Sequence, residues 1–342
     1  GLGFGVGGSM KGLAWGGLGM GIGKDFEGMA LGGLGAGVGG NVRGVLVGGL
    51  GAGIGGDMTG IAYGGLGMAV GGRIEGVMIG GLGVAAGEGG RGLLLGGLGA
   101  GLGGGFEGVL IGGIGAGVGG DFTGVAVAGI GMGVGGHFEG AALTGVGMGV
   151  GGDAVGLMIN GIGMGVGGRA SGLFVNGVGM GVGGRASGIY VNGIGMGVGG
   201  DASGMFFNGW GMGAGGTIRY LSTGGIGVGA NRIEGVSLGG LVLGAHEMQG
   251  LMIAGAWLRV RSADPPFGRR RGRGRIDATR EARFDGLGIS PFTQVLGHQH
   301  GLTIGLVNFA WALQGVQVGL VNIVRDNPPG RRVLPLINWG RH

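Results

Sequence analysis

Glycine and apolar residues alternate along most of the chain, as in "GLGAGVG" at 33–39. A period of two residues is typical of β-strands. Glycine at this density would also cost a helix about 1 kcal/mol per position relative to alanine. The pattern therefore predicts an all-β chain.

The alternation recurs every 16 residues from residue 1 to about 223. The repeating unit is shown by "GGLGAGVGGNVRGVLV" at 32–47 and "GGIGAGVGGDFTGVAV" at 112–127. After 224 the period shortens to 15, and in 301–328 it is 14. A unit of this length accommodates two short strands and two tight turns, and identical units stack about 4.8 Å apart. We expect a glycine-rich parallel β-solenoid with coils of about 16 residues and two short strands per coil.

The repeat divides the chain into three segments. Residues 1–260 carry the glycine-rich coils, 261–284 interrupt the repeat as an arginine-rich inserted loop, and 285–342 carry coils of about 14 residues and a terminal cap. The formal net charge is +5. All of this excess positive charge comes from 261–283, which contains eight arginines and three acidic residues.

The composition supports a folded solenoid. Glycine accounts for 111 of 342 residues, but six prolines are too few for collagen. The chain is 44% apolar and 11% charged, so it has material for a core that a flexible linker lacks. No glycine-free apolar run reaches the length of about 18 residues that a transmembrane helix needs. The absence of cysteine excludes disulfides and thiol catalysis.

We number each coil so that position 1 is Gly32 in the coil 32–47. Positions 3, 5 and 7 are then Leu or Ile, Met or Ala, and Val, and their shared parity predicts that they point inward together with positions 11 and 15. The residues at 11 and 15 offset one another in size, as in Phe122 with Ala126 and Ala202 with Phe206. A close-packed interior of fixed volume requires such an offset.

The methionines at position 5 are predicted to stack in the core, because metal binding by a methionine row is rare. They are Met132, Met148, Met164, Met180, Met196 and Met212. Position 1 becomes asparagine in four coils, where the amides can either hydrogen-bond from coil to coil or serve as turn residues. These residues are Asn160, Asn176, Asn192 and Asn208.

The outward positions predict two uncharged surfaces. Positions 2, 4, 6 and 8 are almost always glycine, which leaves one sheet with a bare backbone suited to close approach of another chain. The candidate assembly face consists of Gly161, Gly163, Gly165, Gly177, Gly179, Gly181, Gly193, Gly195 and Gly197. On the other sheet, Val, Ile or Leu at 14 and 16 predicts an apolar stripe, unless a corner near position 13 turns these residues inward.

Sequence motifs for chemistry are scarce. "GMGVGG" at 163–168 has the G-x-G-x-x-G spacing of a dinucleotide loop, but it recurs from coil to coil and no helical segment follows it, so we expect no cofactor. His298 and His300 could bind a metal, yet no third ligand is evident, and we favour surface histidines. We expect no metal site and no catalytic residues, and hence a protein that is not an enzyme.

The sequence "RRRGRGR" at 269–275 is the one sharp charge feature. Arginine with glycine suits contact with phosphates, anionic lipid or acidic glycans, although such insertions are often only solvated. Nucleic acid is disfavoured because Phe267 alone could stack on a base. The candidate anion-binding residues are Arg269, Arg270, Arg271, Arg273 and Arg275.

The coil pattern "GGLGxGxGGxxxG", joined to "HGLTIGLVNFAWALQGVQVGLVNIVRDNPPGRRVLPLINWG" at 300–340, resembles bacterial surface-repeat-containing proteins, whose ends carry "GLxxGLxN", "GVQxGLxN" and "LPLIN". The matching residues are Gly301, Gly305, Asn308, Gly315, Gln317, Gly319, Asn322, Asn327, Pro328, Pro335 and Asn338. The resemblance implies a bacterial, exported protein at the surface or envelope, with no established reaction. The arginine insertion departs from the family pattern.

Together these features favour a non-enzymatic structural or surface repeat protein, a rod, filament subunit or adhesive scaffold that self-associates or contacts another envelope protein. Its contacts would be the bare glycine face and the apolar stripe. A first alternative is a binding module for an acidic partner, either a glycan, a lipid surface or nucleic acid, through the arginine loop. A second is a membrane β-barrel, disfavoured because strands of about seven residues fall short of the 9 to 11 needed to cross a bilayer. Any secretory signal would lie upstream of residue 1.

Overall fold

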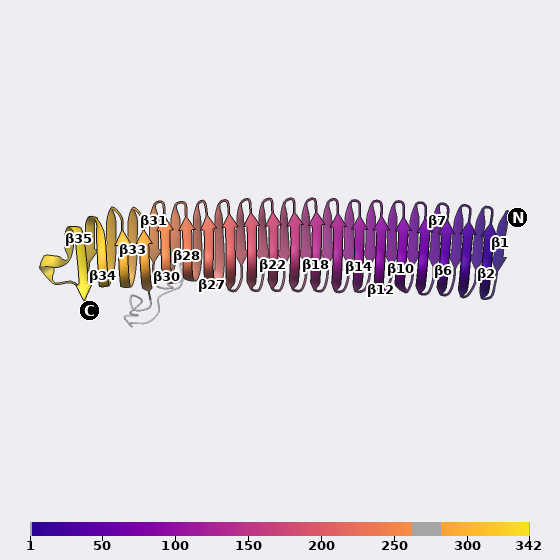
Figure 1. Ribbon diagram of the computed structural model, residues 1–342, viewed down its shortest axis with the longest axis horizontal. Helices are drawn as coiled ribbons and strands as arrows, with labels where there is room; N and C mark the ends of the chain where they lie inside the picture. Colours follow the sequence, from indigo (N-terminus) through magenta and orange to yellow (C-terminus); the bar gives the residue numbers. More distant parts are fainter. Residues whose placement is uncertain (1, 262–281, 342) are drawn as a thin grey trace, which may run out of the picture. The chain divides into compact units, whose positions relative to one another are not determined.

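The computed structural model describes residues 2–261 and 282–341. The chain forms two compact units, unit 1 over residues 1–171 and unit 2 over residues 172–342, and each is treated by itself below. Both are all-β, and within the described residues the one helical element is the short 3-10 turn η1 (Pro329–Arg331). In each unit successive coils pair in parallel, so the predicted parallel β-solenoid is confirmed (Figure 1).

Each coil of unit 1 contributes one short and one long strand. The short strands are β1 (Gly3–Val6), β3 (Gly19–Ile22), β5 (Gly35–Val38), β7 (Gly51–Ile54), β9 (Gly67–Val70), β11 (Gly83–Ala86), β13 (Gly99–Leu102), β15 (Gly115–Val118), β17 (Gly131–Val134), β19 (Gly147–Val150) and β21 (Gly163–Val166). The long strands are β2 (Met10–Gly16), β4 (Phe26–Gly32), β6 (Val42–Gly48), β8 (Met58–Gly64), β10 (Arg73–Gly80), β12 (Gly89–Gly96), β14 (Phe106–Gly112), β16 (Phe122–Ala128), β18 (Phe138–Thr144) and β20 (Ala154–Asn160).

The pairing register of unit 1 equals the sequence period. Gly35 pairs with Gly51, and Phe106 pairs with Phe122, each 16 residues further on. Every coil position therefore becomes a row of equivalent side chains that runs from one coil to the next.

Unit 2 begins with the same two-strand coils and then gains longer strands. Its strands are β22 (Ala170–Asn176), which starts before the boundary, β23 (Gly179–Val182), β24 (Ala186–Asn192), β25 (Gly195–Val198), β26 (Ala202–Asn208), β27 (Gly211–Gly224), β28 (Gly227–Gly239), β29 (Val242–Ala245), β30 (Glu247–Ala254), β31 (Trp257–Val260), β32 (Arg283–Ile289), β33 (Phe292–Ile304), β34 (Val307–Val324) and β35 (Val333–Arg341). The last of these pairs antiparallel with β34, whereas the pairings among β23 to β34 are parallel.

The repeat continues on both sides of the interruption. Strand β30 pairs with β32, with Glu247 opposite Arg283, so the residues between β31 and β32 separate two neighbouring coils. Arg283 and Phe284, at the end of the predicted loop segment, already belong to a strand, and the Phe284 side chain is fully buried.

The core confirms most of the predicted inward positions. Positions 5, 7, 11 and 15 are buried in coil after coil, and so are the six position-5 methionines. Aromatic rings at positions 11 and 15 stack between coils, with centroids 5.2 Å apart for Phe122 and Phe138 and 5.1 Å apart for Tyr190 and Phe206. Burial raises the pKa of the Tyr190 hydroxyl, which hydrogen-bonds to the backbone of Ser187.

The prediction that position 3 is part of the core was wrong. Leu34 and Ile114 are 50% and 49% exposed. The long strand ends at position 1, and the chain bends at positions 2 and 3 before the short strand starts. The Leu34 backbone N–H donates to the Leu18 carbonyl 2.6 Å away, while the side chain points outward from the turn. Strand parity cannot be carried across that turn.

Position 13 bends the long strand without inverting its faces. Gly124 has φ 137°, and a Cβ there would lie 1.9 Å from the carbonyl oxygen of Gly108 in the preceding coil. Glycine suits this conformation and this approach best. The exception is Tyr220, which has φ 79° and pairs with Gly204 at the same position of the preceding coil. Positions 11 and 15, on either side of the bend, are both buried, and the apolar residues at 14 and 16 point outward, as the stripe prediction required.

Candidate interaction faces

The outward side of the short strands forms a bare surface, here called the glycine face and defined as positions 4 and 6 of those strands. In unit 1, position 6 is occupied by Gly5, Gly21, Gly37, Gly53, Ala69, Ala85, Gly101, Gly117, Gly133, Gly149 and Gly165. In unit 2, the face begins with Gly179, Gly181, Gly195, Gly197, Gly211, Gly213, Gly227 and Gly229.

The fold does not require glycine at position 6. A Cβ on Gly117 or Gly133 would meet no atom within 4 Å, and neither residue has a positive φ. Ala69 and Ala85 occupy the same position in two coils and are exposed. Glycine is nevertheless unfavourable in a strand, because it loses more backbone conformational entropy on folding than alanine does. The bare row is therefore a property of the surface and not a demand of the coil.

The turn glycines have a different cause. A Cβ on Gly161 or Gly193, at position 2, would lie within 2 Å of the carbonyl oxygen in the preceding coil, at 1.8 and 1.9 Å. Within the predicted assembly face, Gly161, Gly177 and Gly193 thus belong to turns, whereas Gly163, Gly165, Gly179, Gly181, Gly195 and Gly197 belong to the short strands.

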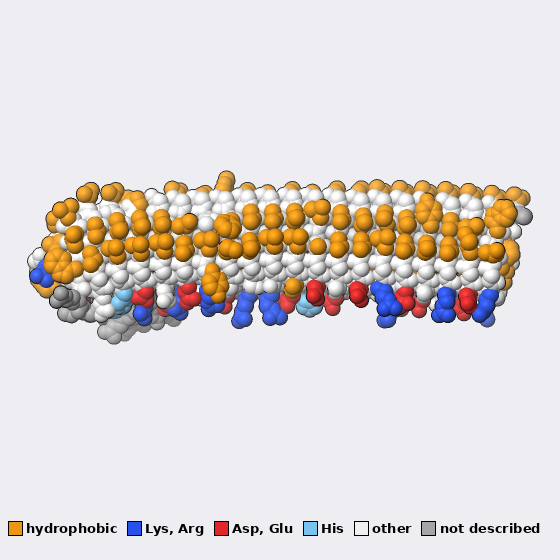
Figure 2. Space-filling view, viewed as in Figure 1, with side chains coloured by type: hydrophobic (Ala, Val, Ile, Leu, Met, Phe, Trp, Pro, Cys, Tyr) orange, Lys and Arg blue, Asp and Glu red, His pale blue; other side chains and the backbone are white. Residues whose placement is uncertain are grey.

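The outward side of the long strands carries the second uncharged surface, here called the apolar ridge and defined as positions 14 and 16. Val125, at position 14, is 47% exposed, and Leu143, at position 16, is 51% exposed. Figure 2 shows these side chains as continuous rows over the long strands of each unit, with the position-3 side chains as a further row along the turns. Repeated exposure of this kind is typical of an interface.

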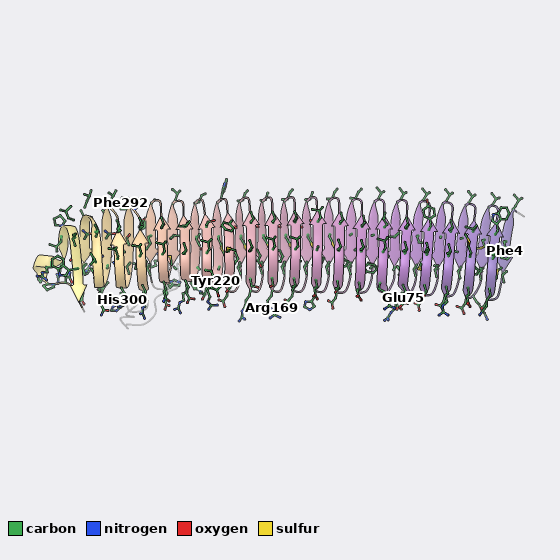
Figure 3. All side chains as sticks on the ribbon, viewed as in Figure 1. Phe4, Glu75, Arg169, Tyr220, Phe292 and His300 are labelled. Carbon is green, nitrogen blue, oxygen red and sulfur yellow. The ribbon has the colours of Figure 1, made fainter. Side chains whose placement is uncertain are left out.

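Charged side chains gather along one edge, at positions 10 and 12, where the long strands begin (Figure 2). Glu75 and Arg169 project from this edge in Figure 3. Charges pair between adjacent coils: Lys11 Nζ lies 2.8 Å from Glu27 Oε2, and Arg169 lies 3.1 Å from Asp153 Oδ2. The Lys11 ammonium group lowers the pKa of Glu27.

Position 10 also has a structural role on this edge. The backbone N–H of His137 donates to Asp121 Oδ1 at 2.7 Å, and that of Arg73 donates to Asp57 Oδ1 at 2.8 Å. The same bond from the Arg169 backbone is the main cause that lowers the pKa of Asp153. The carboxylates are therefore hydrogen-bond acceptors in the turns, and at Asp153 this bond favours the ionised form.

The asparagine row lies inside the coils. In unit 2, Asn176 Nδ2 donates to Asn192 Oδ1 at 3.0 Å, and Asn192 Nδ2 donates to Asn208 Oδ1 at 2.9 Å. In unit 1, the hydroxyl of Thr144 donates to Asn160 Oδ1. All these side chains are buried, at the ends of long strands. Coil-to-coil amide bonding accounts for them, and they present nothing to a ligand.

The remaining candidates for chemistry are few. His298 and His300 both lie in β33, with ring centroids 6.4 Å apart, and His300 Nδ1 is 2.9 Å from Asp285 Oδ1. Among the described residues no three His, Cys, Asp or Glu side chains come together as a metal site. The motif at 163–168 forms strand β21 and the turn after it, so its amides do not face a ligand from a helix start.

The candidate anion-binding residues Arg269, Arg270, Arg271, Arg273 and Arg275 lie outside the described residues. The described part of the chain contains no helix with the length and apolarity to cross a membrane. No family model, no curated protein and no solved structure matches this chain.

Proposed function

We propose that this protein is a structural repeat protein whose copies associate side by side, the apolar ridge of one copy lying on the glycine face of the next. The observation that carries the proposal is the row of position-6 glycines. These residues have room for a side chain and an ordinary backbone conformation, yet side chains larger than a methyl group are absent from the row in unit 1. Glycine is disfavoured in strands, so keeping this surface bare lowers the stability of the sheet. Such a surface suits a partner that approaches the backbone closely.

The two surfaces match in spacing because every coil supplies one residue to each row. The glycine row and the ridge rows therefore share the coil-to-coil distance, about 4.8 Å. A ridge of Val, Ile and Leu side chains can remain in step with the backbone of a second copy over many coils. A second copy is thus the occupant that fits the face without further adaptation.

The area available is sufficient. The glycine face of unit 1 comprises eleven short strands of four residues each. At about 4.8 Å per coil and about 3.3 Å per residue, a contact over this face would bury roughly 1,200 Å² in total. This exceeds the roughly 1,000 Å² expected of a specific interface. Covering each half-exposed Leu or Ile of the ridge contributes about 1 kcal/mol, so some ten of them offset an association cost of several kcal/mol.

Contact between two different faces leaves one glycine face and one apolar ridge free after each addition. Heterologous association of this kind gives open-ended assemblies unless a rotation closes them. The charged edge takes no part in the contact and remains in water, where it keeps the assembly soluble.

The test is a pair of charge variants in unit 1. In the double variant Gly117→Lys, Gly149→Lys, two ammonium groups stand on the glycine face, where we expect loss of the assembled species in sedimentation velocity, because burying unpaired charges is costly. Thr123→Lys with Val155→Lys is the matched control. Both residues are exposed at position 12, and each pairs with Glu139 in the adjacent coil.

The control should assemble as the unaltered protein does, and circular dichroism should show the same strand content in all three proteins. The proposal fails if the glycine-face variant assembles normally, or if the unaltered protein sediments as a single copy.

A further inference from the structure

The glycine face of unit 2 ends abruptly in its last coils. At position 4 of successive short-strand segments, the pairing register aligns Gly227, Val242, Trp257, Phe292 and Val307. The row changes from glycine to bulky apolar residues within one coil. Figure 3 marks Phe292 among these C-terminal coils.

Position 6 changes one coil later. In the same register Gly229 and Gly244 are followed by Arg259, Gln294 and Phe309. The inward residues between the two rows continue as core, since Leu243 and Leu258 are both fully buried. This inward position stays buried in the next two coils, where Thr293 and Asn308 replace the leucines, while the outer surface is raised.

We call Val242, Trp257, Arg259 and Phe292 the shoulder. Val242, Trp257 and Phe292 are 41%, 44% and 50% exposed, so their side chains stand above the sheet. The Arg259 guanidinium lies 5.4 Å from the centre of the Trp257 ring, a cation–π contact that holds both side chains in place. A partner that lies flat on the glycines of β23, β25 and β27 meets the shoulder where β29 begins.

A repeating surface by itself cannot fix how two copies are aligned. Because every coil of the glycine face looks like the next, a partner displaced by one coil, about 4.8 Å, would make nearly the same contacts. A single register requires a feature that interrupts the period. On the described short strands of unit 2, the shoulder is the point at which large side chains interrupt it.

We propose that the shoulder is a stop that sets the register of a second copy on the glycine face of unit 2. This inference rests on the side-by-side association proposed above. The partner copy covers the glycines up to β28 and abuts Val242 and Trp257, because a further displacement of one coil would drive its backbone into those side chains. The exposed apolar surface of Val242 is covered in the same contact.

The test measures register directly and uses the absence of cysteine from the chain. A spin label on Arg185→Cys, a residue 73% exposed on the charged edge, reports the distance between neighbouring copies in assemblies diluted with unlabelled protein. With the shoulder intact we expect one nearest-neighbour distance. In the variant Trp257→Ala, Phe292→Ala, Val242→Gly we expect several distances, separated by steps of about 4.8 Å along the coil direction.

A second variant keeps the test decisive if the first one unfolds. Gly213→Trp places a new obstacle on open space at position 6, two coils before Val242, and should displace the partner by about two coil spacings. Multiple distances with the shoulder intact, or unchanged distances in both variants, would overturn the stop. Absence of assembly in the unaltered protein would instead contradict the association itself, so the two failures are distinguishable.

Discussion

Glycine has three separate roles within a single coil. At position 2 it allows the turn to approach a carbonyl of the preceding coil, as at Gly193. At position 13 it adopts a positive φ, as at Gly124. At position 6, as at Gly117, it meets neither constraint and leaves the outer surface bare. The sequence alone cannot distinguish these roles, because the same residue type occurs at all three positions.

The roles predict opposite effects of alanine within one coil. Gly124→Ala should lower the free energy of unfolding by more than about 2 kcal/mol, since alanine is strained at positive φ and its Cβ would collide with the Gly108 carbonyl. Gly117→Ala should change it by less than about 1 kcal/mol, toward greater stability. Chemical denaturation followed by circular dichroism measures both, under conditions where the protein is a single copy. Equal destabilisation by the two variants would show that position 6 is constrained by the fold.

At the scale of the strand, the sequence pattern predicted the faces well and the turns poorly. Alternation correctly placed positions 5, 7, 11 and 15 inward, because period-2 parity holds within a strand. It misplaced position 3, because "GLG" continues the alternation by letter while the chain bends there. Two apolar residues in the same pattern, Leu110 and Ile114, therefore have different surroundings.

This difference can be measured by truncation. Leu110→Ala, at a fully buried position, should cost about 3 kcal/mol of unfolding free energy. Ile114→Ala, at a side chain 49% exposed, should cost about 1 kcal/mol or less. Thermal and denaturant unfolding of the two variants give the comparison. If Ile114→Ala lowered the free energy of unfolding as much as Leu110→Ala, position 3 would have to be part of the core.

The shoulder shows a different limit of sequence reasoning. Trp257 and Phe292 are 35 positions apart in the chain, and the arginine-rich insertion lies between them. The repeat period also shortens in this region. The alignment of Gly227, Val242, Trp257 and Phe292 therefore cannot be recognised from the sequence alone. Only the strand pairing brings them into one row. The glycine face itself was predictable, because its coils repeat without interruption.

At the scale of the whole molecule, the surfaces divide by chemistry. Among the described residues, most charges lie on the edge at positions 10 and 12, where many pair between coils, whereas the ridge and the glycine face carry almost none. Association should therefore depend on shape and apolar contact more than on charge. In the proposed assembly, the apolar ridge of one copy touches the glycine face of the next.

The most direct measurement of that contact is solid-state NMR of a mixed assembly. One batch of protein carries labelled glycine Cα carbons, the other labelled Val, Ile and Leu methyl groups, so that every glycine-to-methyl cross-peak arises between copies. Contact between the ridge and the glycine face should give such cross-peaks, and they should weaken in Val125→Thr with Leu143→Thr, which makes two ridge positions polar but uncharged. An assembled sample without glycine-to-methyl cross-peaks would contradict it.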